Sequence, residues 1–104
     1  MPIVCLGLNH RTAPVNVREQ FALAEARLPE LLVALRAETS VEEAAILSTC
    51  NRVEIYAATD NAPQQLLNEL RVFLVQDREV DEDVFYELNG AEAVEHLFKV
   101  ASGL

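Results

Sequence analysis

The 104-residue chain is expected to adopt an α+β fold, a ferredoxin-like split β-α-β sandwich with the element order β-α-β-β-α-β and an added C-terminal helix. Three observations predict this fold. Short apolar runs typical of strands alternate with leucine patterns typical of helices. Only a few polar residues separate two of the strands, which favours an antiparallel hairpin. The length suits one domain, which we assign to residues 1–104.

The N-terminal part begins with a predicted strand at residues 2–9, where the run IVCLGLN is apolar. Pro14 disfavours a helical conformation at the residue before it. We therefore expect a loop over residues 10–16, followed by a weak helical turn over residues 17–23. His10 lies in this loop directly after the strand, where functional sites are often built, but it could also be only a loop residue.

The first long helix is predicted over residues 27–38. Its leucines recur at helical spacing, at positions 28, 31, 32 and 35, and Pro29 falls in the first turn, where proline is tolerated. Ser40 and Glu43 have the spacing of a helix capping box. The run AAILST that follows is nevertheless short, apolar and soon interrupted, so we predict a strand there.

The next strand is predicted in the run RVEIYAAT, residues 52–59. Val53, Ile55 and Ala57 alternate with Glu54, Tyr56 and Ala58, and this period of two predicts a half-buried strand. The preceding strand is only a few residues away. The polar segment 48–52 is therefore expected at or near a hairpin end, where side chains are exposed.

The C-terminal part is predicted to contain a helix, a short strand and a final helix. The first of these helices is capped by Asn61, carries apolar residues at 66, 67, 70, 73 and 74, and is expected to end near Asp77. The strand is the run VFYEL. The final helix is the run AEAVEHLFKVA, and its inward residues are expected to be Val94, Leu97, Phe98 and Ala101. This helix has no polar tail after it, so we expect the chain to belong to a larger protein.

Composition and charge exclude several classes of protein. The formal charge is −9 and only eight residues are Lys or Arg, so we expect any contact with nucleic acid to be local. Apolar runs of about four to six residues are far shorter than the roughly 20 needed to cross a bilayer, and no secretion signal is visible, so we expect a cytoplasmic protein without membrane contact. Two widely spaced cysteines predict free thiols.

The two cysteines are expected to have different roles. Cys5 lies inside an apolar strand and is assigned to the core. Cys50 is flanked by Thr49, Asn51 and Arg52, which supply hydrogen-bond donors and a cation that favour a thiolate. In an extended segment Cys50 and Arg52 would share one face, so the guanidinium could hold a carboxylate while the thiolate attacks a carbonyl. The alternative is a turn cysteine beside a solvated arginine.

His96 lies about 150° from the centre of the apolar stripe of the final predicted helix. It is therefore expected to be either an ordinary surface residue or a residue that faces a cleft shared with another domain. Zinc is disfavoured, because the two histidines and two cysteines form no close ligand pairs. The three glycines form no phosphate-binding loop, so we expect no dinucleotide site of that kind in this chain.

Three segments of the chain are characteristic in combination: GLNHRTAPVNVRE at residues 7–19, LSTCNRVEIY at residues 47–56 and HLFKVASGL at residues 96–104. In this order they resemble the signature segments of the N-terminal catalytic domain of the glutamyl-tRNA reductase family. The resemblance runs from residue 3 to the last residue. It implies that NADPH-binding and dimerisation domains lie beyond residue 104, and that the isolated chain reduces nothing.

The resemblance implies an NADPH-dependent reduction of glutamyl-tRNA to glutamate-1-semialdehyde for tetrapyrrole biosynthesis, which leads to porphyrins and haem. Cys50 would form a thioester with the glutamyl group, and His96 would polarise it or shuttle a proton. Thr49, Asn51 and Arg52 would bind the glutamate moiety, with Arg52 on its carboxylate. A full-length homodimer and a channelling partner, glutamate-1-semialdehyde aminomutase, are also implied.

Two other functions remain open from the residues. The chain could be a small α+β regulatory or binding module without covalent chemistry, in which case its cysteines should alkylate slowly near neutral pH. It could also be a cysteine hydrolase or acyltransferase unrelated to tetrapyrroles. A screen against free thioesters and glutamyl esters would separate that function from the first.

Overall fold

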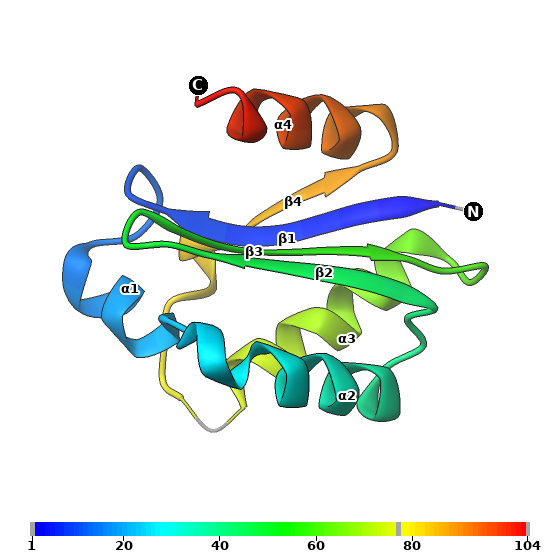
Figure 1. Ribbon diagram of the computed structural model, residues 1–104, viewed down its shortest axis with the longest axis horizontal. Coiled ribbons are helices and arrows are strands. Elements are labelled where there is room, and N and C mark those ends of the chain that lie inside the picture. The colour runs from blue at the N-terminus through cyan, green and yellow to red at the C-terminus, as the bar shows by residue number, and fades with distance from the viewer. Residues whose placement is uncertain (1, 77, 104) are drawn as a thin grey trace.

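The computed structural model describes residues 2–76 and 78–103, and these residues form an antiparallel four-stranded sheet with helices on both faces (Figure 1). The strands are β1 (Ile3–Asn9), β2 (Glu43–Ser48), β3 (Arg52–Ala58) and β4 (Tyr86–Asn89), and their order in the sheet is β2-β3-β1-β4. Both the chain order and the sheet order are those of the split β-α-β sandwich. The predicted fold class is confirmed.

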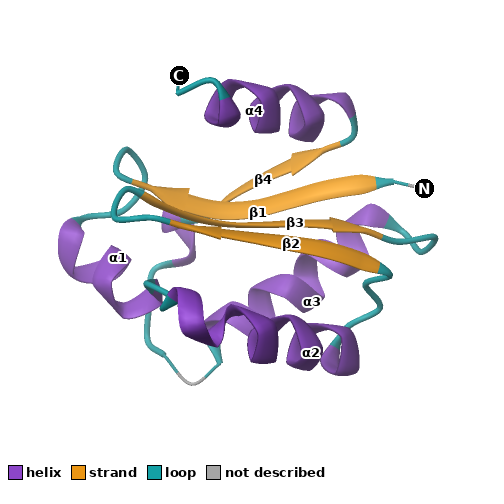
Figure 2. Ribbon diagram, viewed as in Figure 1, coloured by secondary structure: helices purple, strands orange, loops and turns teal. Residues whose placement is uncertain are grey.

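The helices lie in two layers (Figure 2). They are α1 (Val15–Phe21), α2 (Leu28–Glu38), α3 (Pro63–Val75) and α4 (Ala91–Ala101), with two 3-10 turns at Glu25–Arg27 and Glu82–Val84. α1, α2 and α3 lie on one side of the sheet, and α4 lies on the other. Within residues 2–76 and 78–103, none of these helices is long and apolar enough to cross a lipid bilayer.

The main core lies between the sheet and the layer formed by α2 and α3. Alternate residues of β1 and β3 point into it and are buried, among them Leu6, Leu8 and Ile55. The leucine stripe of α3 packs against them, as its helical spacing predicted, and Leu70 is fully buried. Burial of one such side chain stabilises the fold by about 1.5–3 kcal/mol.

α1 begins and ends two residues earlier than the sequence predicted. The predicted loop over residues 10–16 is confirmed up to Pro14, and in place of the weak turn over residues 17–23 a regular helix begins at Val15 and ends at Phe21. Pro14 lies just before it in an extended conformation, and its carbonyl oxygen accepts the N–H groups three and four residues later at 3.1 and 3.0 Å. Proline restricts the residue before it, so a helix can start directly after it.

Two boundaries in the C-terminal half also differ from prediction. α3 is preceded by Ala62 as its N-cap rather than by Asn61. Its last helical residue is Val75, and Asp77, near which the helix was expected to end, lies outside the described residues. β4 begins two residues later than predicted, because the 3-10 turn Glu82–Val84 takes up the start of the VFYEL run.

The face that α4 turns to the sheet is rotated from the one predicted, and it is centred on Ala93. Ala93 is fully buried against the sheet, whereas Leu97 is 42% exposed and Phe98 is 67% exposed. On this side of the helix, Ala93 packs against Cys5 and Tyr56 of the sheet. α4 also explains why residues 53–58 of β3 are buried on both faces instead of on one.

We expect Leu70→Ala to lower the free energy of unfolding by about 2–5 kcal/mol, because it opens a cavity in the fully buried stripe of α3. Val72 lies on the same helix but is 73% exposed, so Val72→Ala should change it by less than about 0.5 kcal/mol. Urea unfolding followed by circular dichroism measures both. If Leu70→Ala and Val72→Ala lowered the free energy of unfolding equally, α3 would not pack as described.

Candidate active site at one edge of the sheet

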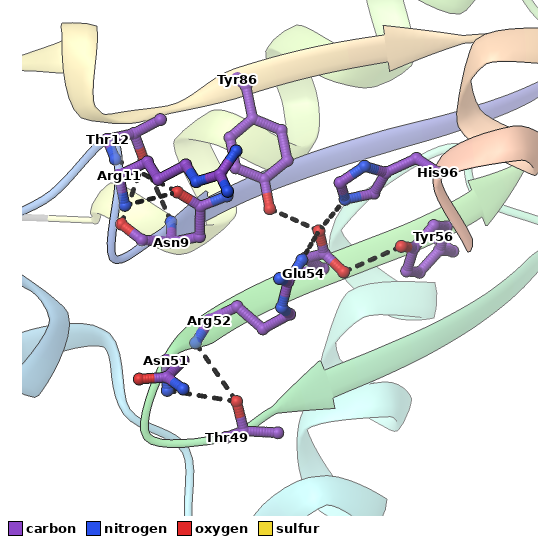
Figure 3. Close-up of polar contacts among 10 residues, drawn as sticks. All are labelled: Asn9, Arg11, Thr12, Thr49, Asn51, Arg52, Glu54, Tyr56, Tyr86 and His96. Atoms are coloured by element: carbon purple, nitrogen blue, oxygen red, sulfur yellow. Dashed lines mark hydrogen bonds and ion pairs between the residues drawn. The ribbon is translucent and has the colours of Figure 1, made fainter. Parts of the chain in front are cut away.

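Residues of four elements, β1, β3, β4 and α4, meet at one edge of the sheet. Antiparallel pairing sets Asn9, at the end of β1, opposite Arg52, at the start of β3. It also sets Tyr86, at the start of β4, opposite Gly7. α4 lies over this face and contributes His96 (Figure 3). The sheet register therefore gathers polar residues from β1, β3, β4 and α4.

The polar segment between β2 and β3 forms the tip of a hairpin, as predicted. The backbone N–H of Thr49 donates to the carbonyl oxygen of Arg52 at 2.8 Å. The Thr49 hydroxyl accepts the backbone N–H groups of Asn51 and Arg52, each at 3.2 Å (Figure 3). Cys50 and Asn51 are bends outside the strands. The strand alternation that would have placed Cys50 and Arg52 on one face therefore does not apply here.

The two thiols lie in opposite environments. Cys50 is exposed at the hairpin tip, and Cys5 is buried in β1, as predicted. Burial, together with the nearby Glu54 carboxylate, raises the pKa of the Cys5 thiol to about 12. Among the residues that the structure describes, no hydrogen bond joins the Cys50 thiol to Arg52 or to His96.

A buried carboxylate, Glu54 of β3, is the centre of the polar cluster (Figure 3). The Tyr56 hydroxyl donates to its Oε1 at 2.8 Å, and the Tyr86 hydroxyl donates to its Oε2. Nε2 of His96 lies 2.5 Å from the same Oε2, and Nη1 of Arg52 lies 3.4 Å from it. Both Arg52 and His96, which the sequence singled out, thus contact one residue that it did not.

These contacts decide the charge state of Glu54. Burial alone would raise the pKa of the carboxyl, but hydrogen bonds from Tyr86, His96 and Tyr56 outweigh it and hold the pKa below its ordinary value. Burial and the same hydrogen bonds to Glu54 raise the pKa of both tyrosine hydroxyls. The cluster is therefore an ionised carboxylate surrounded by donors.

His96 is not an ordinary surface residue, and its possible place in a cleft shared with another domain stays a prediction. Its side chain is 24% exposed and reaches from α4 to Glu54. Its ring packs edge-on against that of Tyr86, with centroids 5.6 Å apart. The inward face of α4 is rotated from the predicted one, and this rotation brings His96 towards the sheet.

The loop between β1 and α1 adds the exposed cation Arg11 beside Arg52. The Asn9 side chain accepts the backbone N–H groups of Arg11 and Thr12 at 2.9 and 3.1 Å, and the Thr12 hydroxyl accepts the N–H of Asn9 at 3.0 Å. These bonds fix the loop and leave His10 and Arg11 exposed. Positive charge thus gathers at one edge of a chain whose net charge is −9.

Sequence reasoning missed Glu54, Tyr56, Tyr86 and Gly7. A glycine inside an apolar strand often marks the close approach of another group, and Gly7 is such a residue. A Cβ atom at Gly7 would lie 2.8 Å from the Tyr86 hydroxyl and 2.9 Å from Cγ of Glu54. Its absence leaves room for these two side chains to meet over β1. The sequence shows the glycine, but only the strand register identifies Glu54 and Tyr86 as the neighbours of Gly7.

Comparison with known proteins points to one family. The family model described as "Glutamyl-tRNAGlu reductase, N-terminal domain" matches residues 6–104. The chain is 48% identical to a glutamyl-tRNA reductase of Xylella fastidiosa strain M12 and 46% identical to one of Alkalilimnicola ehrlichii, with all of this chain aligned in both. It covers only 23% and 24% of those relatives, respectively.

A solved structure supports the same relationship. The glutamyl-tRNA reductase of Methanopyrus kandleri superposes on this chain with a TM-score of 0.73 and 28% sequence identity. The superposition covers 98% of this chain and 22% of that protein. The chain therefore spans about a quarter of the length of the curated relatives that it matches.

We expect a thiol reagent such as iodoacetamide to modify Cys50 rapidly and Cys5 only after unfolding, because Cys50 is exposed and Cys5 is fully buried. Mass spectrometry should find one label per native chain. Cys50→Ser should abolish the fast reaction and Cys5→Ala should preserve it. Fast labelling of Cys5 in the native protein would contradict the assignment of this residue to the core.

We expect stability to fall with rising pH between about pH 9 and pH 12, partly because of Cys5. Its thiol has an ordinary pKa of 9.0 and a folded pKa of about 12, so its contribution is complete below pH 9 and is lost as the pH rises through the folded pKa. Urea unfolding of Cys5→Ala over this range should show a weaker pH dependence than the parent chain. Tyr56 and Tyr86 account for the decline in stability that remains in Cys5→Ala. If stability fell equally steeply with pH in Cys5→Ala and in the parent chain, the role of Cys5 would be contradicted.

Proposed function

This chain belongs to the glutamyl-tRNA reductase family as its N-terminal domain, and on that premise we propose that it transfers the glutamyl group of glutamyl-tRNA to Cys50 as a thioester. The observation that carries the proposal is the position of the thiol. Cys50 is exposed at the tip of a hairpin whose second strand holds Arg52 and Glu54, and Glu54 contacts His96. A nucleophile, a cation and a proton carrier thus lie at one edge of the sheet.

The transfer step needs a thiolate, an activated acyl group and a proton carrier. The Cys50 sulfur attacks the carbonyl carbon of the aminoacyl ester, so a carbon–sulfur bond forms and the carbon–oxygen bond to the terminal ribose breaks. In our proposal His96 takes the thiol proton and gives it to the leaving ribose oxygen. The products are the glutamyl thioester on Cys50 and the free tRNA.

Arg52 is proposed to bind the carboxylate of the glutamate side chain. A guanidinium has five N–H donors, and among residues 2–76 and 78–103 that of Arg52 makes one hydrogen bond, to Glu54 at 3.4 Å. Thr49 and Asn51 of the hairpin tip are proposed to contact the same glutamate moiety. The exposed Arg11 in the neighbouring loop adds positive charge for a local contact with the tRNA backbone.

The residues of this chain do not fit NADPH. Its three glycines lie within β1, directly before α4 and after α4, so they form no glycine-rich turn for a dinucleotide pyrophosphate. We therefore assign residues 1–104 to a single catalytic domain. Reduction of the thioester to glutamate-1-semialdehyde is assigned to the complete protein, with NADPH held by a separate domain.

The remaining assignments follow from the same premise. The complete protein is proposed to be a homodimer in the cytoplasm that supplies tetrapyrrole biosynthesis and passes its product to glutamate-1-semialdehyde aminomutase. The two free thiols agree with a reducing compartment. An unrelated cysteine hydrolase would share the thioester step but would release free glutamate.

We expect incubation with labelled glutamyl-tRNA to leave one hydroxylamine-sensitive label on Cys50 of each chain. Cys50→Ser should lower the rate of ester loss at least about 10³-fold, because it removes the nucleophile. Cys5→Ala is the matched control and should retain the label. Filter binding and mass spectrometry follow the two products, protein-bound and free glutamate. Equal ester loss in the parent chain and Cys50→Ser would reject thiol participation.

A further inference from the structure

We propose that Glu54 is a positioning residue that holds the imidazole of His96 with its proton on Nε2, and so makes Nδ1 the nitrogen that exchanges a proton during acyl transfer. The inference rests on the proposed function of the site. It adds a residue that the sequence did not single out and gives the two ring nitrogens of His96 separate tasks.

The burial and the partners of Glu54 argue for a constrained carboxylate. The side chain is fully buried, and a buried charge is unfavourable by several kcal/mol unless it is paired and hydrogen-bonded. Tyr56 and Tyr86 each donate a hydroxyl hydrogen to it. A carboxylate that receives these donors is ionised and can only accept. A neutral His96 must therefore donate its Nε2–H to Oε2, at the observed 2.5 Å.

The ring of His96 is held in orientation as well as in tautomer. Nε2 is fixed by Glu54, and the plane of the imidazole is restrained by its T-shaped contact with the Tyr86 ring, at an interplanar angle of 63°. Only 24% of the side chain is exposed. Nδ1 is the ring nitrogen that Glu54 leaves free, and it has a lone pair when Nε2 carries the proton.

The strand register shows how the cluster is built. Gly7 stands directly between Glu54 on β3 and Tyr86 on β4. With a Cβ atom at position 7, the Tyr86 hydroxyl and Glu54 Cγ would be 2.8 and 2.9 Å away, closer than real contacts allow. The missing side chain thus lets the phenol reach the carboxylate across β1. From there Tyr86 supports both Glu54 and His96.

Glu54 also connects the proton carrier to the proposed carboxylate-binding residue. Arg52 and His96 contact the same oxygen, Oε2, at 3.4 and 2.5 Å. One fixed carboxylate therefore sets the positions of both groups relative to each other. A purely structural explanation is weaker, because replacing a buried charged cluster with well-packed apolar residues is often neutral or stabilising.

The tautomer can be measured without any change to the site. Nitrogen-15 chemical shifts of the complete protein, labelled at histidine, distinguish a protonated from an unprotonated ring nitrogen. Signals that disappear in His96→Gln and remain in His10→Gln are assigned to His96. At alkaline pH, where the imidazole is neutral, we expect Nε2 to carry the proton and Nδ1 to be bare. A neutral ring with its proton mainly on Nδ1 would overturn the proposal.

Glu54→Gln tests the consequence. The amide brings two N–H donors to a place that needs acceptors, so we expect His96 to populate both tautomers and the rate of thioester formation to fall about 10²-fold or more at saturating glutamyl-tRNA. KM should change far less than this rate. The matched control is Glu87→Gln on β4, whose carboxylate pairs with Arg71 at 2.8 Å outside the cluster. Glu87→Gln should leave the tautomer of His96 and the rate of thioester formation unchanged.

Tyr86→Phe provides a second test should Glu54→Gln fail to fold. It removes one donor to Oε2 and keeps the ring beside His96, so we expect a smaller loss of rate in the same direction. A wild-type tautomer ratio or a wild-type rate in folded Glu54→Gln would overturn the proposal. If the parent protein forms no thioester at all, the proposed function fails, while the tautomer measurement still decides the positioning role of Glu54.

Discussion

The need to satisfy one buried carboxylate shapes the whole face of the sheet beneath α4. Glu54 is fully buried in β3, and the surrounding chain supplies donors from β3, β4 and α4. A group of this kind is tolerated only where several partners converge on it. The glycine opposite it in β1, the two phenols and the direction of α4 can all be understood as consequences of that requirement.

The same requirement explains the unusual packing of α4. A helix over a sheet ordinarily buries its apolar stripe. Here Ala93 gives a close approach, His96 reaches the carboxylate, and the apolar residues Leu97 and Phe98 face outward and are substantially exposed. The helix thus combines a small apolar contact at Ala93 with a polar contact that holds His96 over the sheet.

The site combines side chains that are held in place by Glu54 with a thiol that is exposed to solvent. His96 and Arg52 are held through Glu54, whereas Cys50 stands at a hairpin tip that Thr49 closes with two backbone contacts. The proposed acyl transfer requires both properties. The thiol must be reachable by a large substrate such as tRNA, and the groups that bind and exchange protons must keep their geometry while it reacts.

The sequence by itself determined the element order, the leucine stripes of α2 and α3, the hairpin, and the different burial of Cys5 and Cys50. These features depend on local spacing, which repeats along the chain. Tertiary structure alone decided which face of α4 packs inward, that β3 is buried on both sides, and that Glu54 joins Arg52 to His96. Those outcomes depend on strand register and on partners distant in the sequence, and no local pattern encodes which residues will meet.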